Sequence, residues 1–504
     1  MNVWKWYKNI VKKTVSPEKQ KSKPQYEIKE NEPVTLESLK SKFQNIDDLI
    51  IKEINVNDEK ALLIYLSSLT NASMIQELVL TPLNSTSDNI QPENAIKHSA
   101  TVNMGDLNTL VYNIMSGYTI LYFLNREFIL EIDTYKVENR SVESAENETT
   151  VMGPQDSFNE SLTTSISLIK QRIRSFNLKT KIMQMGTETN DDVAILYMDN
   201  IANNENVQRV IRRVQNIEYQ GFVSLPILKQ MLEDKPFSPF PQFGITVRTD
   251  YATEALLDGR IIVMINGSPE AAILPATFFE MFTSTEDYYN RWSTATLLRA
   301  IRLGGFLISI LLTSTYISVL TYHPEMLPPT LLTMLSESRT QVPFPPLLEV
   351  LIIELVIEIL REAGSRMPTK IGQTIGIVGG IVIGQAAVEA GLTSNVLIVL
   401  VATSALLSFL PPNFLMSNAV RLVRYGFIIA GGTLGMFGQF VFLAWLMNHL
   451  LNLTSLGSPY MTPFVPRKWT DLFNSVLRAP INFMVTRAGI SRAKKQLTRP
   501  LDEE

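Results

Sequence analysis

The sequence predicts an α+β multi-domain protein, in which a cytosolic N-terminal region of two tandem α/β subdomains precedes an α-helical polytopic membrane domain. The first observation is the distribution of charge: residues 303–450 contain only 13 Asp, Glu, Lys and Arg residues. Uncharged runs in that part reach the roughly 18 or more apolar residues that indicate a membrane-spanning helix. The second observation is that residues 30–290 are charged like an ordinary soluble protein and contain a repeated strand–turn–helix pattern.

The repeated pattern defines the two α/β subdomains. The strand 61-ALLIYLSS leads through a turn into the helix 73-SMIQELVLTPL, and the same order recurs in 193-VAILYMDNIANNENVQRVIRRVQ. Aligning Tyr65 with Tyr197 also matches Asn71 with Asn203 and Gln76 with Gln208. The strand–turn–helix order is typical of an α/β unit.

These patterns divide the chain into six segments. The first segment holds seven lysines within 23 residues together with Trp4, Trp6 and Tyr7, which fits either an anionic membrane surface or a solvated tail. The predicted segments are a basic disordered tail (1–35), α/β subdomain 1 (36–140), α/β subdomain 2 (141–240), a linker and membrane-approach region (241–300), a helical membrane domain (301–466) and a basic cytoplasmic tail (467–504).

The membrane domain has five candidate spans. Arg291, Arg299 and Arg302 precede the first span, which places the N-terminal region in the cytoplasm by the positive-inside rule. Five crossings would leave the basic C-terminal tail outside, so we expect a broken sixth crossing through 450–466, or four crossings with a non-crossing glutamate helix. The candidate spans are 303–322, 346–362, 371–391, 394–412 and 425–448.

Composition excludes several functions. The chain has no cysteine, so disulfides, thiolate catalysis and Cys-type zinc sites are excluded, and its three histidines are far apart. Its formal net charge of −4 gives no sign of nucleic-acid binding. We find no nucleophile elbow, phosphate loop or signal peptide, and expect no enzyme activity, cofactor or metal.

The sharpest motif is a stripe of acids in the apolar helix 346-PLLEVLIIELVIEILREAGSRMP. Glu354, Glu358 and Glu362 share one helix face with Arg361 beside them, while Glu349 lies off the stripe. A charge at the bilayer centre costs about 2.5–3.5 kcal/mol, so this face should avoid lipid. It would line an ion path or contact another subunit; the alternatives are a solvated interfacial face or structural Glu–Arg pairs.

A second motif is glycine at every fourth position. Gly372, Gly376, Gly380 and Gly384 lie on one face of the predicted helix 371–391. Small residues at this spacing let two membrane helices approach closely. A nucleotide-binding loop is excluded because no Gly-Lys-Ser/Thr follows.

At these motifs the chain resembles the A subunit of the nutrient germinant receptors of endospore-forming bacteria, the GerA-type family. Beside 153-GP the chain departs from the pattern: Met152 stands where the family usually has an arginine, and Gln155–Asp156 replaces the typical arginine–glutamate. The stretches that carry the resemblance are 322-YHPEMLP, 342-VPFP, 358-EILREAGSRMP, 372-GQTIGIVGGIVIGQAAVEAGL and 421-RLVR, with 153-GP, 172-RIR, 239-PFPQ, 248-RTD and 286-EDYY upstream.

The resemblance implies an integral protein of the spore inner membrane that acts with a transporter-like B subunit and a lipoprotein C subunit. It implies a homo-oligomeric ring that forms a nutrient-gated ion channel and triggers spore germination. The residues by themselves leave two other functions open, a secondary transporter and a non-conducting signalling scaffold.

Overall fold

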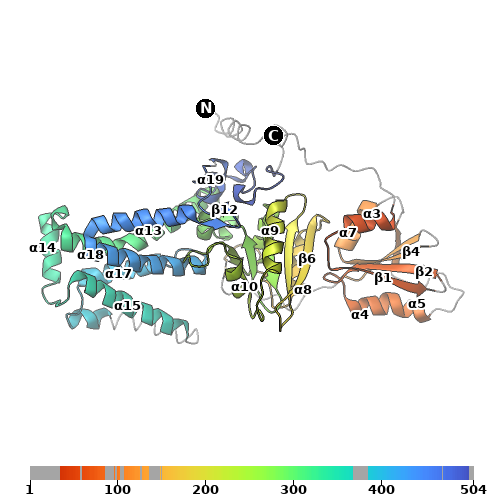
Figure 1. Cartoon of the computed structure of the whole chain (residues 1–504), viewed down its shortest axis with the longest axis horizontal. Coiled ribbons are helices and arrows are strands. Elements are labelled where there is room, and N and C mark those ends of the chain that lie inside the picture. The colour runs from red at the N-terminus through yellow and green to blue at the C-terminus, as the bar shows by residue number, and fades with distance from the viewer. Residues whose placement is uncertain are drawn as a thin grey trace, which may run out of the picture.

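The protein is elongated, with a helical bundle at one end and two α/β domains in line beyond it (Figure 1). The computed structural model describes residues 34–56, 59–85, 96, 99–102, 107–124, 128–135, 148, 150–366, 384–467 and 469–498. The predicted basic tail, 1–35, therefore lies almost entirely outside the described residues.

The first α/β domain is a five-stranded antiparallel sheet with the order β1-β2-β4-β5-β3. Alternate residues of β2 face opposite layers, because Leu62 and Ile64 join one core cluster and Ala61 and Leu63 the other. Its elements are α3 (Leu36–Lys42), β1 (Leu49–Val56), β2 (Glu59–Leu66), α4 (Ala72–Ile75), η1 (Gln76–Leu80), α5 (Thr81–Ser85), β3 (Ser99–Val102), α7 (Leu107–Met115), β4 (Tyr118–Phe123) and β5 (Phe128–Asp133).

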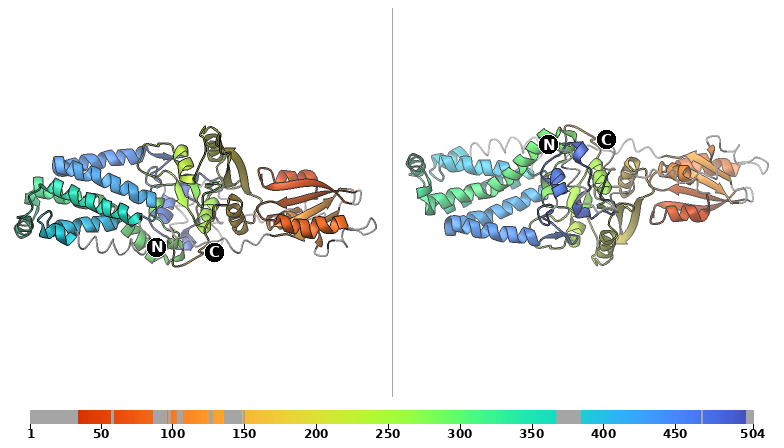
Figure 2. Two further views of the ribbon diagram at one scale, coloured as in Figure 1. Left: turned by 90° about the horizontal axis from the view of Figure 1, so that it is seen from below. Right: turned by 90° about the horizontal axis from the view of Figure 1, so that it is seen from above.

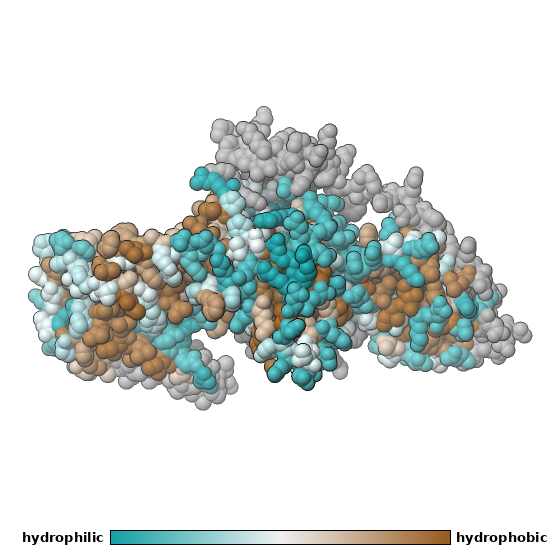
Figure 3. Space-filling model, in the orientation of Figure 1, coloured by the Kyte–Doolittle hydropathy of each residue, from teal (hydrophilic) through white to brown (hydrophobic). Residues whose placement is uncertain are grey.

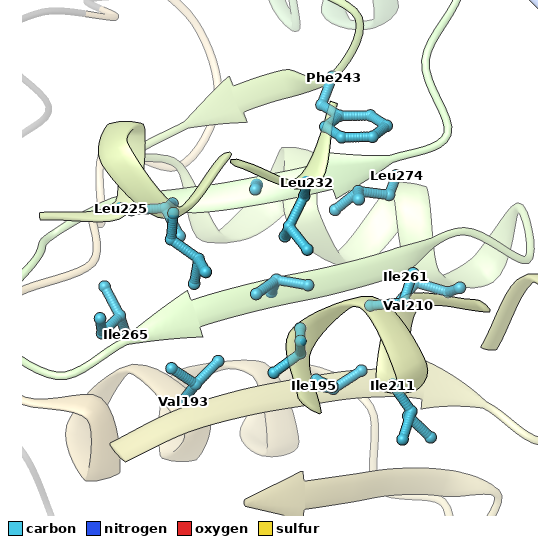
Figure 4. Close-up of a cluster of buried hydrophobic side chains, with 14 of the residues drawn as sticks. Val193, Ile195, Val210, Ile211, Leu225, Leu232, Phe243, Ile261, Ile265 and Leu274 are labelled. Atoms are coloured by element: carbon cyan, nitrogen blue, oxygen red, sulfur yellow. The ribbon is translucent and has the colours of Figure 1, made fainter. Parts of the chain in front are cut away.

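The second α/β domain repeats this topology, with the strand order β6-β7-β9-β10-β8. Helices α9 and α10 cover one face of its sheet over a core that includes Val193, Ile195 and Val210 (Figure 4). Its elements are α8 (Leu162–Arg172), β6 (Leu178–Met185), β7 (Asp191–Met198), α9 (Asn204–Gln215), α10 (Leu225–Leu232), β8 (Gly244–Thr246), α11 (Thr249–Leu257), β9 (Ile261–Ile265) and β10 (Ala271–Leu274).

The internal match found in the sequence has a structural cause. Tyr65 lies on β2 and Tyr197 on β7, the equivalent strands of the two sheets. Asn71 is the N-cap of α4 and Asn203 the N-cap of α9, and each side chain accepts a backbone hydrogen bond from the first turn. Asparagine is a preferred N-cap residue, so the shared asparagine marks the start of the same helix in both domains.

The second sheet extends further along the chain than the sequence boundaries. Strands β8, β9 and β10 lie within 241–300, which the sequence assigned to a linker and membrane approach. An Asn-Gly turn follows β9, with Gly267 at a φ of +84° before β10. Short apolar strands and segments that approach a bilayer have similar amino-acid composition. Only the pairing of the strands in the sheet distinguishes the two.

The two α/β domains are joined by a buried contact. Lys170 Nζ of α8 lies 2.5 Å from an Asp48 carboxylate oxygen of the first domain, and both side chains are almost fully buried. Ile46 and Thr180 form a parallel bridge beside this ion pair, and the Asp47 amide donates to the Thr180 carbonyl. A buried ion pair flanked by backbone bonds holds the domains in one relative orientation.

The helical bundle lies beside the second domain. Two helices among the described residues, α13 and α18, are long and apolar enough to cross a membrane, and α17 is a shorter apolar helix. The elements of this part are η2 (Phe279–Phe282), α12 (Glu286–Tyr289), α13 (Trp292–Tyr322), η3 (Pro324–Met326), α14 (Pro329–Ser338), α15 (Pro346–Ser365), α17 (Asn395–Leu407) and α18 (Phe414–Asn452).

Helix α18 is a hairpin of two antiparallel helices. The chain reverses at Gly435, whose φ of 64° and ψ of −148° are non-helical. The rings of Phe427 and Phe442 have centroids 4.9 Å apart, whereas a straight helix would separate these residues by about 22 Å. The sequence treated 425–448 as one span, but the structure divides it between the two arms of the hairpin.

The bundle helices lie side by side along the long axis of the molecule (Figure 2), and their packing contacts give the direction of each helix. Helix α13 and the first arm of α18 run away from the second domain, since Gly305 lies beside Leu410 near the domain and Tyr322 beside Gly435 at the far end. Helix α15 runs back toward the domain, because Leu347 packs on Gly432 at the far end of the bundle. The second arm of α18 also returns to the domain.

The C-terminal segment packs on the second domain. Residues 453–466, where the sequence suggested a broken crossing, instead contain a two-stranded hairpin and a turn, and Tyr460 donates to the Pro241 carbonyl at 2.6 Å. Further on, the Lys494 side chain donates to the Asp199 carbonyl at 2.6 Å. The segment contains β11 (Thr454–Ser455), β12 (Ser458–Pro459), α19 (Trp469–Ser475), η4 (Ile481–Phe483) and η5 (Gly489–Ser491).

Candidate functional site in the helical bundle

Helix α15 carries the acidic stripe into the bundle. Pro345 is its N-cap and Pro346 its first residue, a position where the missing N–H of proline costs nothing. The three stripe glutamates differ in exposure: the side chain of Glu354 is 0% exposed, that of Glu358 34% and that of Glu362 63%. The stripe therefore runs from the inside of the bundle to its surface.

Glu354 faces Arg424 across the contact between α15 and the first arm of α18. Arg424 Nη2 lies 2.8 Å from Glu354 Oε2, and neither side chain is exposed. Arg424 also donates through Nη1 to Ser404 Oγ of α17 at 3.0 Å. Among the described residues neither Glu354 oxygen has a partner with hydrogen-bond geometry, so the 2.8 Å contact is an electrostatic pairing of two buried charges.

Glu358 is the centre of a second ionic contact. Its Oε2 accepts from Arg361 Nη1 at 3.1 Å, and its Oε1 accepts from Arg421 Nη1 at 2.6 Å. The Arg361 guanidinium also lies over the Phe409 ring, 4.5 Å from its centroid. The structure thus brings Glu354, Glu358 and Arg361 together with two arginines of α18, Arg421 and Arg424.

Glu362 lies apart from this network. Its side chain pairs with Arg366 one turn further along α15, at 2.6 Å, and both groups are largely exposed. Exposed pairs of this kind contribute little to stability, about 0.3–0.5 kcal/mol.

Glu349, which the stripe left unexplained, has a separate role. Its carboxylate is fully buried, lies 3.2 Å from Arg339 Nε, and accepts from the Ser394 amide at 2.8 Å and from the Thr393 hydroxyl at 3.2 Å. Ser394 is the N-cap of α17, so Glu349 places a negative charge at the positive end of that helix. The one feature of the sequence that separates Glu349 from the other acids is its position off the helix face that they share.

Small polar residues line the contact between α13 and α18. Ser314 Oγ donates to the Phe427 carbonyl at 2.6 Å, and Ser318 Oγ donates to the Gly431 carbonyl at 3.2 Å. Gln439, on the second arm, donates to Ser318 Oγ at 2.8 Å. A Cβ at Gly431 would come within 2.3 Å of Ser314 Oγ, so glycine permits this close approach.

The predicted glycine face is only partly visible. Gly372, Gly376 and Gly380 lie outside the described residues. At Gly384 an added Cβ would meet nothing within 4 Å. The close-packing role of these four glycines stays a prediction.

The junction between the second domain and the bundle contains another buried charge. Asp287 is fully buried and accepts from Arg299 Nε at 2.9 Å and from Arg302 Nη1 at 2.8 Å. Tyr288 lies beside it, 5.6 Å below the Arg299 guanidinium. Two of the arginines that the sequence used for membrane orientation therefore also hold α13 onto the domain.

A small cavity lies between α11 and the C-terminal segment, lined by Glu254, Asp258, Arg260 and Asp471 among others. Its volume of about 50 Å³ holds only a few water molecules. Burial raises the pKa of Glu254 to about 8, and the nearby Asp258 charge adds to the effect. Within the described part of the chain, no three His, Cys, Asp or Glu side chains group as metal ligands.

Comparisons with known proteins identify the family. The family model described as "Bacillus/Clostridium GerA spore germination protein" matches residues 37–490. The chain is 39% identical over 479 residues to the spore germination protein GerQA of Bacillus cereus, covering 94% of this chain and 96% of that protein. It is 34% identical over 463 residues to the spore germination protein B1 of Bacillus subtilis, covering 90% of this chain and 95% of that protein.

A solved structure is also similar to part of the chain. It is the N-terminal domain of the A subunit of the Bacillus megaterium spore germinant receptor GerK3, at 23% identity and a TM-score of 0.37, covering 49% of this chain and 97% of that chain. The family model and the curated relatives each extend over both the α/β domains and the helical bundle. The chain therefore belongs to the GerA family of spore germination proteins.

Proposed function

We propose that this chain is the A subunit of a nutrient germinant receptor in the spore inner membrane, and that it forms an oligomeric nutrient-gated ion channel with B and C partner subunits. The family supports the receptor role. The observation that carries the channel role is the buried, charged network on α15, because charges are retained inside an apolar bundle chiefly where they serve a function.

The bundle supports six passes through the membrane. The passes are α13, α15, the segment 371–391, α17 and the two arms of α18. Helices α15 and α17 both run toward the second domain, since Glu349 contacts the start of α17 and Ser404 near its end contacts Arg424. With the span 371–391, predicted from the sequence, between them, the proposal has an even number of passes, which leaves both the N-terminal domains and the C-terminal segment in the cytoplasm.

The acidic stripe would control ion flow through the ion pairs that Glu354 and Glu358 form with arginines of α18. With Glu354 and Glu358 held by arginines of α18, their charges are neutralised in the structure described here. A nutrient signal that shifts α15 against α18 would free these carboxylates, and free carboxylates around a shared axis attract cations. Glu362 already lies at the surface, where it can meet a second copy of the chain or the aqueous end of the path.

The test is ion flux through assembled receptors. Glu354→Gln, Glu358→Gln and Glu362→Gln are measured for nutrient-triggered potassium release from spores and for conductance of the reconstituted complex. Glu337→Gln is the matched control, because Glu337 is an exposed acid on α14 at the far end of the bundle. We expect altered flux or gating in the stripe variants alone; unchanged flux and gating in all three would contradict the role.

The ion pairs also favour a second candidate, a non-conducting signalling scaffold. Glutamates that are already paired with arginines can serve as fixed braces between helices. A scaffold would pass no current in a reconstituted complex that still responds to nutrient, whereas a channel would. A secondary transporter would instead accumulate substrate against a gradient, which the same preparation can measure.

A further inference from the structure

We propose that four phenylalanines at the domain-proximal ends of the helices, Phe237, Phe409, Phe414 and Phe464, form a lipid-contact collar that seats the second domain on the headgroup region of the bilayer. This inference rests on the proposed membrane location and adds a surface of the α/β part to it. It assigns a membrane role to the proline-rich stretch 235-KPFSPFPQFG.

The first observation is exposure. Phe237 is 101% exposed, Phe414 73%, Phe409 59% and Phe464 47%. A phenylalanine side chain gains about 1.5–3 kcal/mol from burial, so four residues left this exposed, even with Phe409 beside Arg361 and Phe464 on Phe279, indicate contact with an apolar phase.

The second observation is that all four residues lie at the level where the bundle meets the second domain, near the domain-facing ends of the helices. Phe414 is the first residue of α18, and Phe409 lies in the short connection that precedes it. Phe464 packs on Phe279 of η2, with centroids 4.8 Å apart. Phe237 is next to Ser238, whose hydroxyl lies 2.9 Å from His449 Nε2 near the end of the second α18 arm.

The third observation is the surface on either side of this level. Toward the far end of the bundle the outer surface is apolar, with Leu422, Ile429 and Trp445 all more than half exposed. The second domain on the other side is largely hydrophilic (Figure 3). The collar therefore lies where the hydrophobic surface of the helices gives way to the polar surface of the domain, the position that aromatic residues occupy in membrane proteins.

The charges beside the collar fit a phospholipid surface. Lys235 is exposed two residues before Phe237, and Arg467 is exposed three residues after Phe464. An aromatic ring with a nearby basic side chain suits the boundary between acyl chains and anionic headgroups. The four rings come from three separate stretches of the chain, which favours a bilayer plane over a single docked protein segment.

The experiment uses tryptophan as a depth probe in the full chain, in nanodiscs of phosphatidylethanolamine and phosphatidylglycerol. Phe237→Trp and Phe464→Trp are compared with Tyr112→Trp, since Tyr112 is 51% exposed on α7 in the first domain, at the opposite end of the molecule (Figure 1). Spin labels are carried by the lipid either close to the headgroup or at the end of the acyl chain. The added fluorescence of each variant is measured relative to the unsubstituted chain.

We expect the headgroup-proximal label to quench the indole introduced at position 237 or 464 more than the chain-end label does, and neither label to quench the indole introduced at position 112. Absence of lipid quenching at 237 and 464, with the native fluorescence that Trp445→Phe removes still quenched by lipid, would overturn the collar while leaving the membrane location intact. Absence of lipid quenching of that native fluorescence as well would overturn the membrane location itself. A blue-shifted probe at 237 or 464 that no lipid label quenches would place that ring in a contact between copies, which also contradicts the collar.

Discussion

Replacing Glu354 by glutamine should destabilise the helical bundle more than the same change at any other glutamate of the acidic stripe. The side chains of Glu354 and Arg424 are both 0% exposed, and their closest approach is 2.8 Å. Glutamine keeps the size of the side chain but removes its charge. The Arg424 guanidinium would then remain buried with one hydrogen bond to Ser404 and no counter-ion.

The size of the stability loss in Glu354→Gln follows from the burial of the ion pair. Removing one partner of a buried ion pair costs about 3–5 kcal/mol, because the other charge stays uncompensated away from water. At roughly 2–4 °C per kcal/mol, the apparent melting temperature should fall by about 6–20 °C. Glu362→Gln is the matched comparison: its pair with Arg366 is exposed and contributes about 0.3–0.5 kcal/mol.

The assay is thermal unfolding of the purified chain in detergent, followed by the loss of the monodisperse peak in size-exclusion chromatography. The double variant Glu354→Leu with Arg424→Met removes both charges and should recover most of the loss, since an apolar pair replaces a buried ion pair at little cost. Equal melting temperatures for Glu354→Gln and Glu362→Gln would refute the buried pairing. A double variant as unstable as Glu354→Gln would show that the loss comes from packing rather than from charge.

Three other changes test different parts of the molecule. Gly435→Ala should cost about 1–3 kcal/mol, because a φ of 64° with a ψ of −148° is a glycine conformation; a melting temperature equal to that of the unsubstituted chain would contradict the α18 hairpin. Asp48→Asn should loosen the contact between the two α/β domains by leaving buried Lys170 without its counter-ion, seen as faster proteolysis between the domains, and unchanged proteolysis would argue against it. Burial raises the pKa of Glu254 to about 8, so the folded chain binds this proton more tightly than the unfolded chain and loses stability as pH rises from about 4.5 to about 8. Glu254→Gln should flatten that pH dependence of the melting temperature, and an unchanged slope would count against the shift.

Much of the α/β region was readable from local sequence signals. The match of Asn71 with Asn203 identified two equivalent helix starts, because an N-cap depends on one side chain and the first turn beside it. The Asn-Gly turn after β9 is a local signal of the same kind, since its Gly267 has the positive φ that glycine favours. The boundary at 240 differed from the structure because β8, β9 and β10 join the sheet through pairing with strands distant in the chain.

In the bundle, hydropathy located α13, α15, α17 and α18 but did not show how they pair. Arg421 and Arg424 are more than 60 residues from their glutamate partners, and nothing in either stretch alone indicates the contact. Glu349 likewise gains its role only when the start of α17 comes beside it.

The sequence by itself determined the family, the repeated α/β units, the apolar character of the helices and the acidic face of α15. These depend on residue type and on spacings of a few residues, which set periodicity, capping and hydropathy. Only the tertiary structure decided that the chain reverses at Gly435, that arginines of α18 neutralise Glu354 and Glu358, and that residues 453–498 return to the second domain. These features arise from contacts between distant segments, whose energy depends on packing geometry that no short window of sequence contains.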